Sequence, residues 1–315
     1  MRAAVLCGSG HVELAEAPVP EPGPGQVRLR LEGCGVCGSD LPVWEGRDWF
    51  TYPQEHGAPG HETWGIVDAV GPGVSGVAEG ERVAALSYRG YADYDIADTG
   101  RLVALGPALD GRPFPGEALG CAVNVFRRSG IAPGDTVAVV GVGFLGSIVT
   151  QMSARSGARV IGVSRRALSR EMSLTMGAQA AVGLDGDPIQ EVRELIDGEL
   201  CDVVIEAAGV QTTLDVASAL VRERGRLVVA GFHQDGRRTV DMQSWNWRGI
   251  DVINAHERDP AVYVGGIAAA AAAIAEGRLD PDPLYTDRFG LEDVAEAFTA
   301  MSDSAGTTVK ALVCP

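Results

Sequence analysis

Residues 136–166, TVAVVGVGFLGSIVTQMSARSGARVIGVSRR, decide the fold class of this chain. The valine-rich run 136–140 follows the turn-forming Pro133-Gly134-Asp135, and it predicts a buried parallel strand. A helix-compatible segment, 147–155, comes next, and a second apolar run covers 159–163. Strand, helix and strand of these lengths predict a βαβ unit, the repeating element of a doubly wound parallel sheet.

The turn between the first strand and the helix spells G-x-G-x-x-G. Its first glycine permits a tight turn, the second lets a pyrophosphate approach the backbone, and the third lets the helix lie close to the strand. Because glycine makes up 42 of the 315 residues, a glycine-rich turn without a ligand is the alternative. The flanking strand and helix favour a dinucleotide site at the helix N-terminus. It would comprise Gly141, Gly143, Phe144, Leu145 and Gly146.

The second strand ends in Ser164-Arg165-Arg166. An NAD site usually carries Asp or Glu here, which accepts hydrogen bonds from the ribose 2′-hydroxyl. Two guanidinium groups could instead bind a 2′-phosphate in bidentate fashion. The alternative is that both arginines are solvated surface charges. The charge pattern favours NADP(H) over NAD(H).

Composition excludes several classes of function. The net charge is −16, which opposes nucleic-acid or anionic-membrane binding as the main role. No apolar run approaches the length of a membrane span, and the apolar N-terminal run is too short for a secretion signal. Six cysteines in such a chain suggest thiols or metal ligands rather than a disulfide framework. We expect a cytoplasmic globular protein of two domains.

The first third of the chain, residues 1 to about 120, has short alternating runs and many turns, which predict a mostly β domain. It contains C-G-S-D at 37–40, G-H-E-x-x-G at 60–65 and G-E-R-V at 80–83, and Cys121 follows. Cys37, His61 and Cys121 are three widely separated sulfur and nitrogen ligands. Such a set suits a catalytic zinc, which keeps its fourth position open.

Several of these residues can also be interpreted as structural, without a role in binding or catalysis. Free cysteine is commonly a small buried hydrophobe, which suits Cys7, Cys34, Cys201 and Cys314. Cys34 to Cys37 also spells C-x-x-C, although the thioredoxin-like surroundings are missing. The aromatic loop VWEGRDWFTYP, 43–53, either borders a substrate or packs onto the sheet.

Strand and helix patterns alternate again from residue 166 to about 256. They extend the parallel sheet, whose ligands lie at the carboxyl ends of the strands. Two strand-end segments, around Ala208 and Gly231, would therefore line the cofactor site. The alanine-rich segment 260–277 predicts one long helix, and the remaining C-terminal segments predict a short strand, a helix and a last strand.

Taken together, these motifs resemble the zinc-dependent medium-chain alcohol dehydrogenase family over essentially the whole chain. The resemblance implies a GroES-like catalytic domain at 1–121 and 257–315 and a Rossmann cofactor domain at 122–256, hence a mixed α/β fold. It implies zinc ligation by Cys37, His61 and Cys121, with Glu62 able to approach the metal. It further implies the following roles: Ser39 takes the substrate proton, Asp40 orients the histidine, and Lys310 contacts the cofactor pyrophosphate.

Two departures from the family pattern matter. The segment 84–92 has no cysteine where many members hold a second, structural zinc, so we expect one zinc per chain. Pro42 stands where some members have a proton-relaying histidine. The hypothesis is NADP(H)-linked oxidation of an alcohol, such as a polyol or a sugar-derived alcohol, or the reverse reduction of a ketone, by a homodimer or homotetramer. The alternatives are a zinc-free enoyl or quinone reductase of this fold and a non-catalytic NADPH-binding protein.

Overall fold

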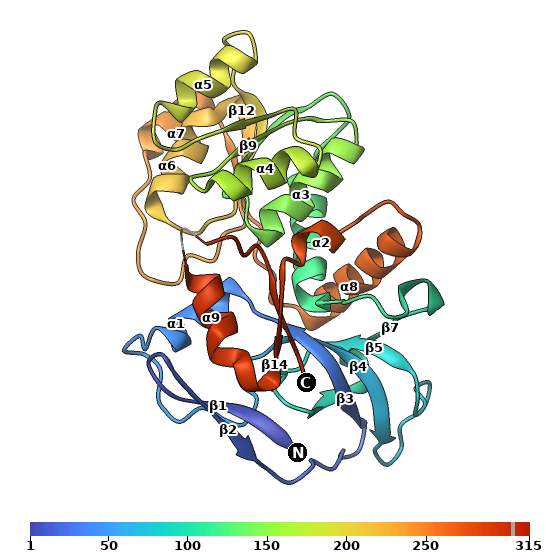
Figure 1. Cartoon of the computed structure of the whole chain (residues 1–315). Helices are drawn as coiled ribbons and strands as arrows, with labels where there is room; N and C mark the ends of the chain where they lie inside the picture. The colour runs from blue at the N-terminus through green and yellow to red at the C-terminus, as the bar shows by residue number, and fades with distance from the viewer. Residues whose placement is uncertain (304–305) are drawn as a thin grey trace. The chain divides into compact units, whose positions relative to one another are not determined.

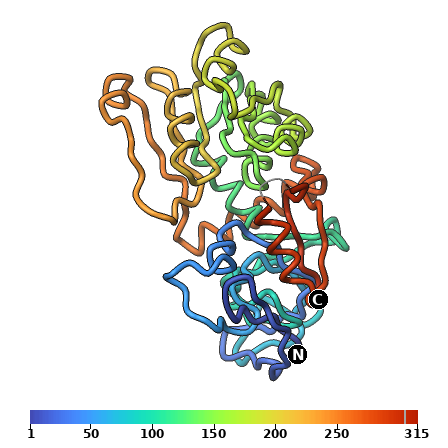
Figure 2. The backbone as a smooth tube through the Cα atoms, turned by 60° about the vertical axis from the view of Figure 1, so that its left-hand side comes forward, coloured from blue at the N-terminus to red at the C-terminus, as the bar shows by residue number. Residues whose placement is uncertain are grey.

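In the computed structural model the chain forms two compact units, and the structure describes residues 1–303 and 306–315 (Figure 1). The first unit contains residues 1–120 and 259–315, and the second contains residues 121–258. Both ends of the chain belong to the first unit (Figure 2). Helix α2, Gly116–Ser129, carries the chain from the first unit into the second.

The first unit is built on a seven-stranded sheet with the order β14-β15-β3-β4-β5-β7, and β6 pairs with β3. Its strands are β3 (Gln26–Gly35), β4 (Glu62–Val70), β5 (Arg82–Ala85), β6 (Tyr94–Asp98), β7 (Leu102–Ala104), β14 (Asp287–Gly290) and β15 (Ala311–Cys314). Strands β1 (Arg2–Gly8) and β2 (His11–Glu16) form a separate antiparallel pair. The C-terminal strand therefore returns to the N-terminal sheet, where β15 lies beside β3 (Figure 2).

Strand β3 shows why these segments become strands. From Gln26 to Leu31 its residues alternate between exposed or half-exposed and buried, with Val27, Leu29 and Leu31 on the buried side. These three pack with Val67 and Val83 of the next two strands into one apolar cluster. A second cluster joins β1, β15 and helix α9 (Val294–Ser302) through residues such as Phe298. The other helices of this unit are α1 (Leu41–Trp44) and α8 (Pro260–Ala275).

The second unit is a six-stranded parallel sheet with the order β10-β9-β8-β11-β12-β13. Its strands are β8 (Thr136–Val140), β9 (Arg159–Val163), β10 (Ala180–Val182), β11 (Cys201–Glu206), β12 (Val221–Val229) and β13 (Asp251–Asn254). Its helices are α3 (Phe144–Arg155), α4 (Ala167–Thr175), α5 (Pro188–Leu195), α6 (Gln211–Leu220) and α7 (Met242–Arg248). The first strand lies in the middle, and the chain winds outward in both directions from it, so the sheet is doubly wound.

The switch in winding direction falls between β8 and β11, which are neighbours in the sheet. Ligands of doubly wound sheets bind at the carboxyl ends of the strands beside such a switch. The G-x-G-x-x-G turn leaves β8 at this point, and α3 begins at Phe144, three residues earlier than the sequence pattern predicts. Among the described residues, no helix combines the length and the apolar character needed to cross a membrane.

Candidate metal centre and cofactor site

The register of the first unit's sheet brings three distant segments to one end. Gly35 at the end of β3 pairs with Glu62 at the start of β4 and with Leu312 of β15. Cys37 comes two residues after β3, and His61 comes one residue before β4. The antiparallel pairing of β3 with β4 therefore places a thiol and an imidazole side by side, although 24 positions separate them in the sequence.

Cys37 caps a single turn of 3-10 helix, Gly38–Asp40. Its backbone N–H donates to Asp40 Oδ2 at 3.2 Å, and its Sγ accepts from the Ser39 N–H at 3.5 Å. The motif C-G-S-D is thus a capped turn in which the carboxylate at its end fixes the cysteine at its start. Ser39 lies half-buried directly beside the thiol.

The orientation of His61 follows from its Nδ1 atom. Nδ1 lies 3.2 Å from Asp40 Oδ1 and 3.0 Å from the Pro59 carbonyl oxygen. Both oxygens are acceptors, so Nδ1 carries a proton and Nε2 presents its lone pair in the neutral ring. Burial opposes the charged form of His61, but the Asp40 carboxylate and the Cys37 thiol outweigh burial and raise its pKa well above the ordinary value. Asp40 thus lies beside His61 Nδ1, and its role in orienting a metal-bound histidine stays a prediction.

Glu62 is completely buried and is held by a buried lysine. Lys310 Nζ lies 2.7 Å from both carboxylate oxygens and 3.1 Å from the Val36 carbonyl. Burial opposes the ammonium form, yet Glu62 outweighs burial and raises the pKa of Lys310. Gly35 leaves room for this pair, because a Cβ there would lie 1.9 Å from Glu62 Oε2. The described contacts make Lys310 a counter-ion for Glu62, and its contact with a pyrophosphate stays a prediction.

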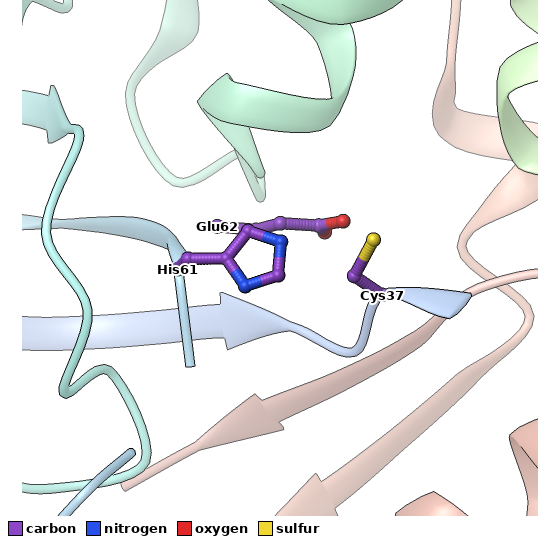
Figure 3. Close-up of side chains that lie close together, drawn as sticks. All are labelled: Cys37, His61 and Glu62. Atoms are coloured by element: carbon purple, nitrogen blue, oxygen red, sulfur yellow. The ribbon is translucent and has the colours of Figure 1, made fainter. Parts of the chain in front are cut away.

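Cys37, His61 and Glu62 offer ligand atoms that lie within 4.8 Å of one another (Figure 3). In the close-up, the thiol of Cys37 and the carboxylate of Glu62 approach each other beside the imidazole ring. Thiolate sulfur, imidazole nitrogen and carboxylate oxygen are the ligands that zinc takes in proteins, so the donor set fits a zinc ion. Cys121 belongs to the second unit, and its place among the ligands stays a prediction.

Sequence reasoning missed Glu117. This residue stands in the first turn of α2, and its Oε2 lies 4.0 Å from His61 Nε2, the nitrogen that Asp40 leaves for a metal. Its side chain is 16% exposed, so the carboxylate is largely removed from bulk water. A signal was available, because Glu117 precedes Cys121 by four residues and therefore lies on the same face of a helix.

The aromatic loop after α1 is mainly a packing element. Trp44 stacks on Phe298 with ring centroids 5.3 Å apart, and the Tyr52 hydroxyl donates to the Val43 carbonyl. Phe50 packs against the same apolar cluster. Trp49 differs from these residues, because it is 55% exposed. For Trp44, Phe50 and Tyr52 the contacts support packing onto the apolar cluster rather than a border of the substrate site.

In the second unit the three glycines of the turn have different surroundings. Gly141 has φ +97°, a value that side chains rarely adopt, and a Cβ there would lie 2.7 Å from the Ala208 nitrogen. A Cβ on Gly146 would lie 2.2 Å from the Gly141 carbonyl oxygen. A Cβ on Gly143 would meet no protein atom within 4 Å. The outer two glycines thus allow close packing, while Gly143 faces open space at the start of α3. Phe144 is buried, and Leu145 is half-buried.

The end of β9 carries the arginines that the sequence predicts for a 2′-phosphate, and this binding stays a prediction. Ser164 is buried, whereas Arg165 is exposed. Arg166 Nε donates to Ser169 Oγ at 3.2 Å. Arg170 donates to the carbonyls of Ser164 and Arg165 at 3.0 and 2.6 Å, which fixes the backbone of this turn. The turn is therefore ordered from within, and the Arg165 guanidinium extends into solvent.

A buried network that the sequence did not reveal joins the strand ends near Ala208 and Gly231. Glu206 is completely buried, and its Oε1 accepts from the N–H groups of Ala208 and Gly209 at 2.9 and 2.8 Å. Its Oε2 lies 2.9 Å from His233 Nε2, and Arg238 Nε donates to His233 Nδ1 at 2.8 Å. The loops after β11 and β12 are thereby held together.

Comparisons with known proteins agree with this architecture. The family model described as the alcohol dehydrogenase GroES-like domain matches residues 23–103, and that of the zinc-binding dehydrogenases matches residues 145–271. The chain is 27% identical to sorbitol dehydrogenase of Halalkalibacterium halodurans, covering 98% of this chain and 97% of that protein. It is 26% identical to (R,R)-butanediol dehydrogenase of Neisseria gonorrhoeae, covering 100% and 99%.

A solved structure also shows similarity to a dehydrogenase of this kind. A protein of Sinorhizobium meliloti, described as a zinc-binding dehydrogenase bound to NADP, superposes with a TM-score of 0.88 at 27% identity, covering 100% of this chain and 99% of that one. The chain belongs to the zinc-dependent medium-chain alcohol dehydrogenase family. Its GroES-like and Rossmann folds, which the sequence predicted, are confirmed.

Within this family architecture, the two sets of predicted residues divide between the units. The C-G-S-D and G-H-E motifs belong to the GroES-like unit, and the glycine turn with Ser164 to Arg166 belongs to the Rossmann unit. The family's G-E-R-V motif has a structural role here. Arg82 pairs with Glu32 at 2.6 Å and donates to the carbonyls of Leu109 and Arg112, both at 2.7 Å, which ties β5 to the segment before α2.

Proposed function

We propose that this protein is a zinc-dependent oxidoreductase that transfers hydride between NADP(H) and an alcohol or ketone. The observation that carries the proposal is the Cys37–His61 pair with its orienting carboxylate, Asp40, in a chain that also has a dinucleotide turn. The named relatives are sorbitol and butanediol dehydrogenases, which supports a polyol or a secondary alcohol as the substrate class.

Cys37 Sγ and His61 Nε2 would hold the zinc ion, together with Cys121 as the predicted third ligand. When bound, zinc supplies Lewis-acid polarisation of an oxygen and lowers the pKa of an alcohol. Asp40 keeps the proton on His61 Nδ1, so that Nε2 stays a ligand throughout the reaction. Lys310 neutralises Glu62 and so limits the negative charge beside the thiolate.

By the family resemblance, Ser39 would accept the hydroxyl proton of the substrate; its backbone N–H donates to Cys37 Sγ, so the residue lies beside the proposed metal ligand. Pro42 cannot pass this proton onward, so the proton must leave Ser39 by another route. A bound nicotinamide cofactor would supply the hydride chemistry, and the chain's own contribution would be to bind and orient cofactor and substrate.

Zinc analysis and one substitution test this function. The purified protein should hold one zinc per chain, and it should oxidise members of a panel that includes sorbitol and 2,3-butanediol. Cys37→Ser should lower kcat by about 10³-fold or more, because several kcal/mol of charge stabilisation are lost, while cofactor binding changes little. Full turnover without zinc would favour the zinc-free reductase. Cofactor binding without any turnover would favour the non-catalytic alternative.

A pair of variants identifies the third ligand of the proposed zinc ion. Cys121→Ser and Glu117→Gln each remove one candidate donor from the same face of α2. Loss of zinc in the first variant alone supports the predicted cysteine. Loss in the second alone assigns the position to Glu117, whose carboxylate lies 4.0 Å from His61 Nε2.

The preference for NADP(H) rests on Arg165 and Arg166, together with Ser164 in place of a carboxylate. Fluorescence titration should give tighter binding of NADPH than of NADH. Arg165→Ala should weaken NADPH binding by about 10- to 100-fold, the equivalent of one hydrogen bond between charged groups, and should leave NADH binding unchanged. Equal loss for both cofactors would contradict the assignment. A homodimer or homotetramer stays a prediction, which sedimentation would check.

A further inference from the structure

Tyr91 belongs to the short segment between β5 and β6. It is among the largest side chains that are completely buried. Its ring meets Phe298 edge-on, with centroids 5.5 Å apart, and Phe298 in turn stacks on Trp44. These contacts fix the ring, but they would serve a phenylalanine equally well. They therefore do not explain the hydroxyl group.

The hydroxyl of Tyr91 has a specific partner. It donates to Asp40 Oδ2 at 2.8 Å, and Asp40 itself is 2% exposed. The same Oδ2 accepts from the Cys37 N–H at 3.2 Å, while Oδ1 lies 3.2 Å from His61 Nδ1. One buried carboxylate thus receives donors from three segments, and two of these donors belong to the proposed metal ligands.

The backbone of this segment also holds the chain that leads to His61. Tyr91 N–H donates to the Gly57 carbonyl at 3.0 Å, and Gly90 N–H donates to the Gly60 carbonyl at 2.9 Å. The fit is close, because a Cβ on Gly60 would lie 2.8 Å from the Tyr91 nitrogen. The segment therefore places His61 through its backbone and reaches Asp40 through the hydroxyl.

We propose that Tyr91 is a positioning residue for the metal site, and this inference rests on the proposed function. Its hydroxyl holds the Asp40 carboxylate in the rotamer in which Oδ1 faces the His61 ring. Without that hydrogen bond, the carboxylate could turn about its side-chain bonds, and the direction of the His61 Nε2 lone pair would be less defined. Groups that orient a metal-bound histidine in this way affect metal affinity as well as activity.

The test is Tyr91→Phe in the zinc-loaded protein, with Tyr94→Phe as the matched control. Tyr94 lies on β6 with its ring near the Arg28 guanidinium, so the control loses a tyrosine hydroxyl in the same unit away from the metal ligands. Zinc affinity is measured by competition with a chromophoric chelator. The zinc dissociation constant should rise by about 3- to 10-fold for Tyr91→Phe, below the 10- to 100-fold typical of direct partners of a ligand, and should not change for Tyr94→Phe.

Two further measurements separate positioning from a general effect on the fold. The visible absorption spectrum of the cobalt-substituted protein should shift for Tyr91→Phe only, because it reports the ligand geometry. In an Asp40→Ala background, Tyr91→Phe should change zinc affinity by less than about twofold, since residues that act through one another are not additive.

Zinc affinity and a cobalt spectrum equal to wild type in Tyr91→Phe would overturn the inference, as would an equal loss in both backgrounds. A wild-type protein that binds no zinc would instead refute the proposed function, and the inference with it.

Discussion

The two glycines Gly143 and Gly146 should respond in opposite ways to the same substitution. A Cβ on Gly146 would lie 2.2 Å from the Gly141 carbonyl oxygen, which is backbone and cannot rotate away. Overpacking of this kind costs up to about 3 kcal/mol, and alanine recovers about 1 kcal/mol through its higher helix propensity. Because the clash of 2.2 Å is with backbone, the cost should lie at the upper end of this range, and Gly146→Ala should lower the free energy of unfolding by up to about 2 kcal/mol.

Gly143 is the matched control within the same turn. A Cβ there meets no protein atom within 4 Å, and its φ of −87° is open to any residue. Gly143→Ala loses only the advantage of glycine at a helix N-cap, about 0.5–1 kcal/mol. Its methyl group would, however, occupy the space through which a pyrophosphate approaches the α3 N-terminus. Cofactor affinity should fall by about 10- to 100-fold, which corresponds to about 1.4–2.8 kcal/mol.

Urea unfolding without cofactor and fluorescence titration with NADPH measure the two quantities separately. We expect Gly146→Ala to unfold at lower urea concentration, and Gly143→Ala to unfold near the wild-type midpoint but to bind cofactor weakly. The reasoning is refuted if Gly143→Ala binds NADPH as tightly as wild type. It is equally refuted if Gly146→Ala matches the wild-type midpoint.

Three further predictions concern buried groups. Lys310→Met should destabilise the metal-free protein by about 3–5 kcal/mol in urea unfolding, because Glu62 is left buried without its counter-charge. Adding Glu62→Gln should restore much of the lost stability. An unchanged urea midpoint in Lys310→Met would contradict the pairing. His233→Ala should lower the free energy of unfolding by about 1–3 kcal/mol, because Glu206 Oε2 loses a buried partner, and a change below about 0.5 kcal/mol would argue against the network. Burial raises the pKa of Cys201 to about 12, so at pH 8 only about one thiol in 10⁴ is ionised. Mass spectrometry after iodoacetamide treatment should find Cys201 unmodified in the native protein and modified in urea, and native labelling would count against its burial.

The sequence carries a local signal for each element of the Rossmann unit's first half. Apolar runs of strand length, a glycine turn and a helix in the order of residues 136–166 are enough to predict the βαβ unit. The boundaries of the strands are weakly encoded: the apolar run at 226–230 predicts a strand, but β12 begins five residues earlier, at Val221. Helix α7 was not predicted, since a seven-residue helix leaves little periodicity to detect.

In the metal centre, too, some features have a local signal in the sequence and others have none. Cys37 and Asp40 lie three positions apart, and the capping turn that joins them is local, so the C-G-S-D motif carries its own geometry. The contacts from other segments are not local. Glu117 reaches His61 from α2, and the Tyr91 hydroxyl reaches Asp40 from the segment after β5. No spacing in the sequence relates Glu117 to His61 or Tyr91 to Asp40.

The sequence by itself determined the turns, caps and strands that carry the candidate phosphate and metal ligands, because these local features depend on neighbours within a few positions. Only the tertiary structure decided which buried charges and hydroxyls meet. Lys310 and Glu62 are 248 positions apart, and Tyr91 and Asp40 are 51 apart. Such contacts depend on the register of β3 with β4 and β15, which is set by the packing of the whole sheet and leaves no periodic pattern along the chain.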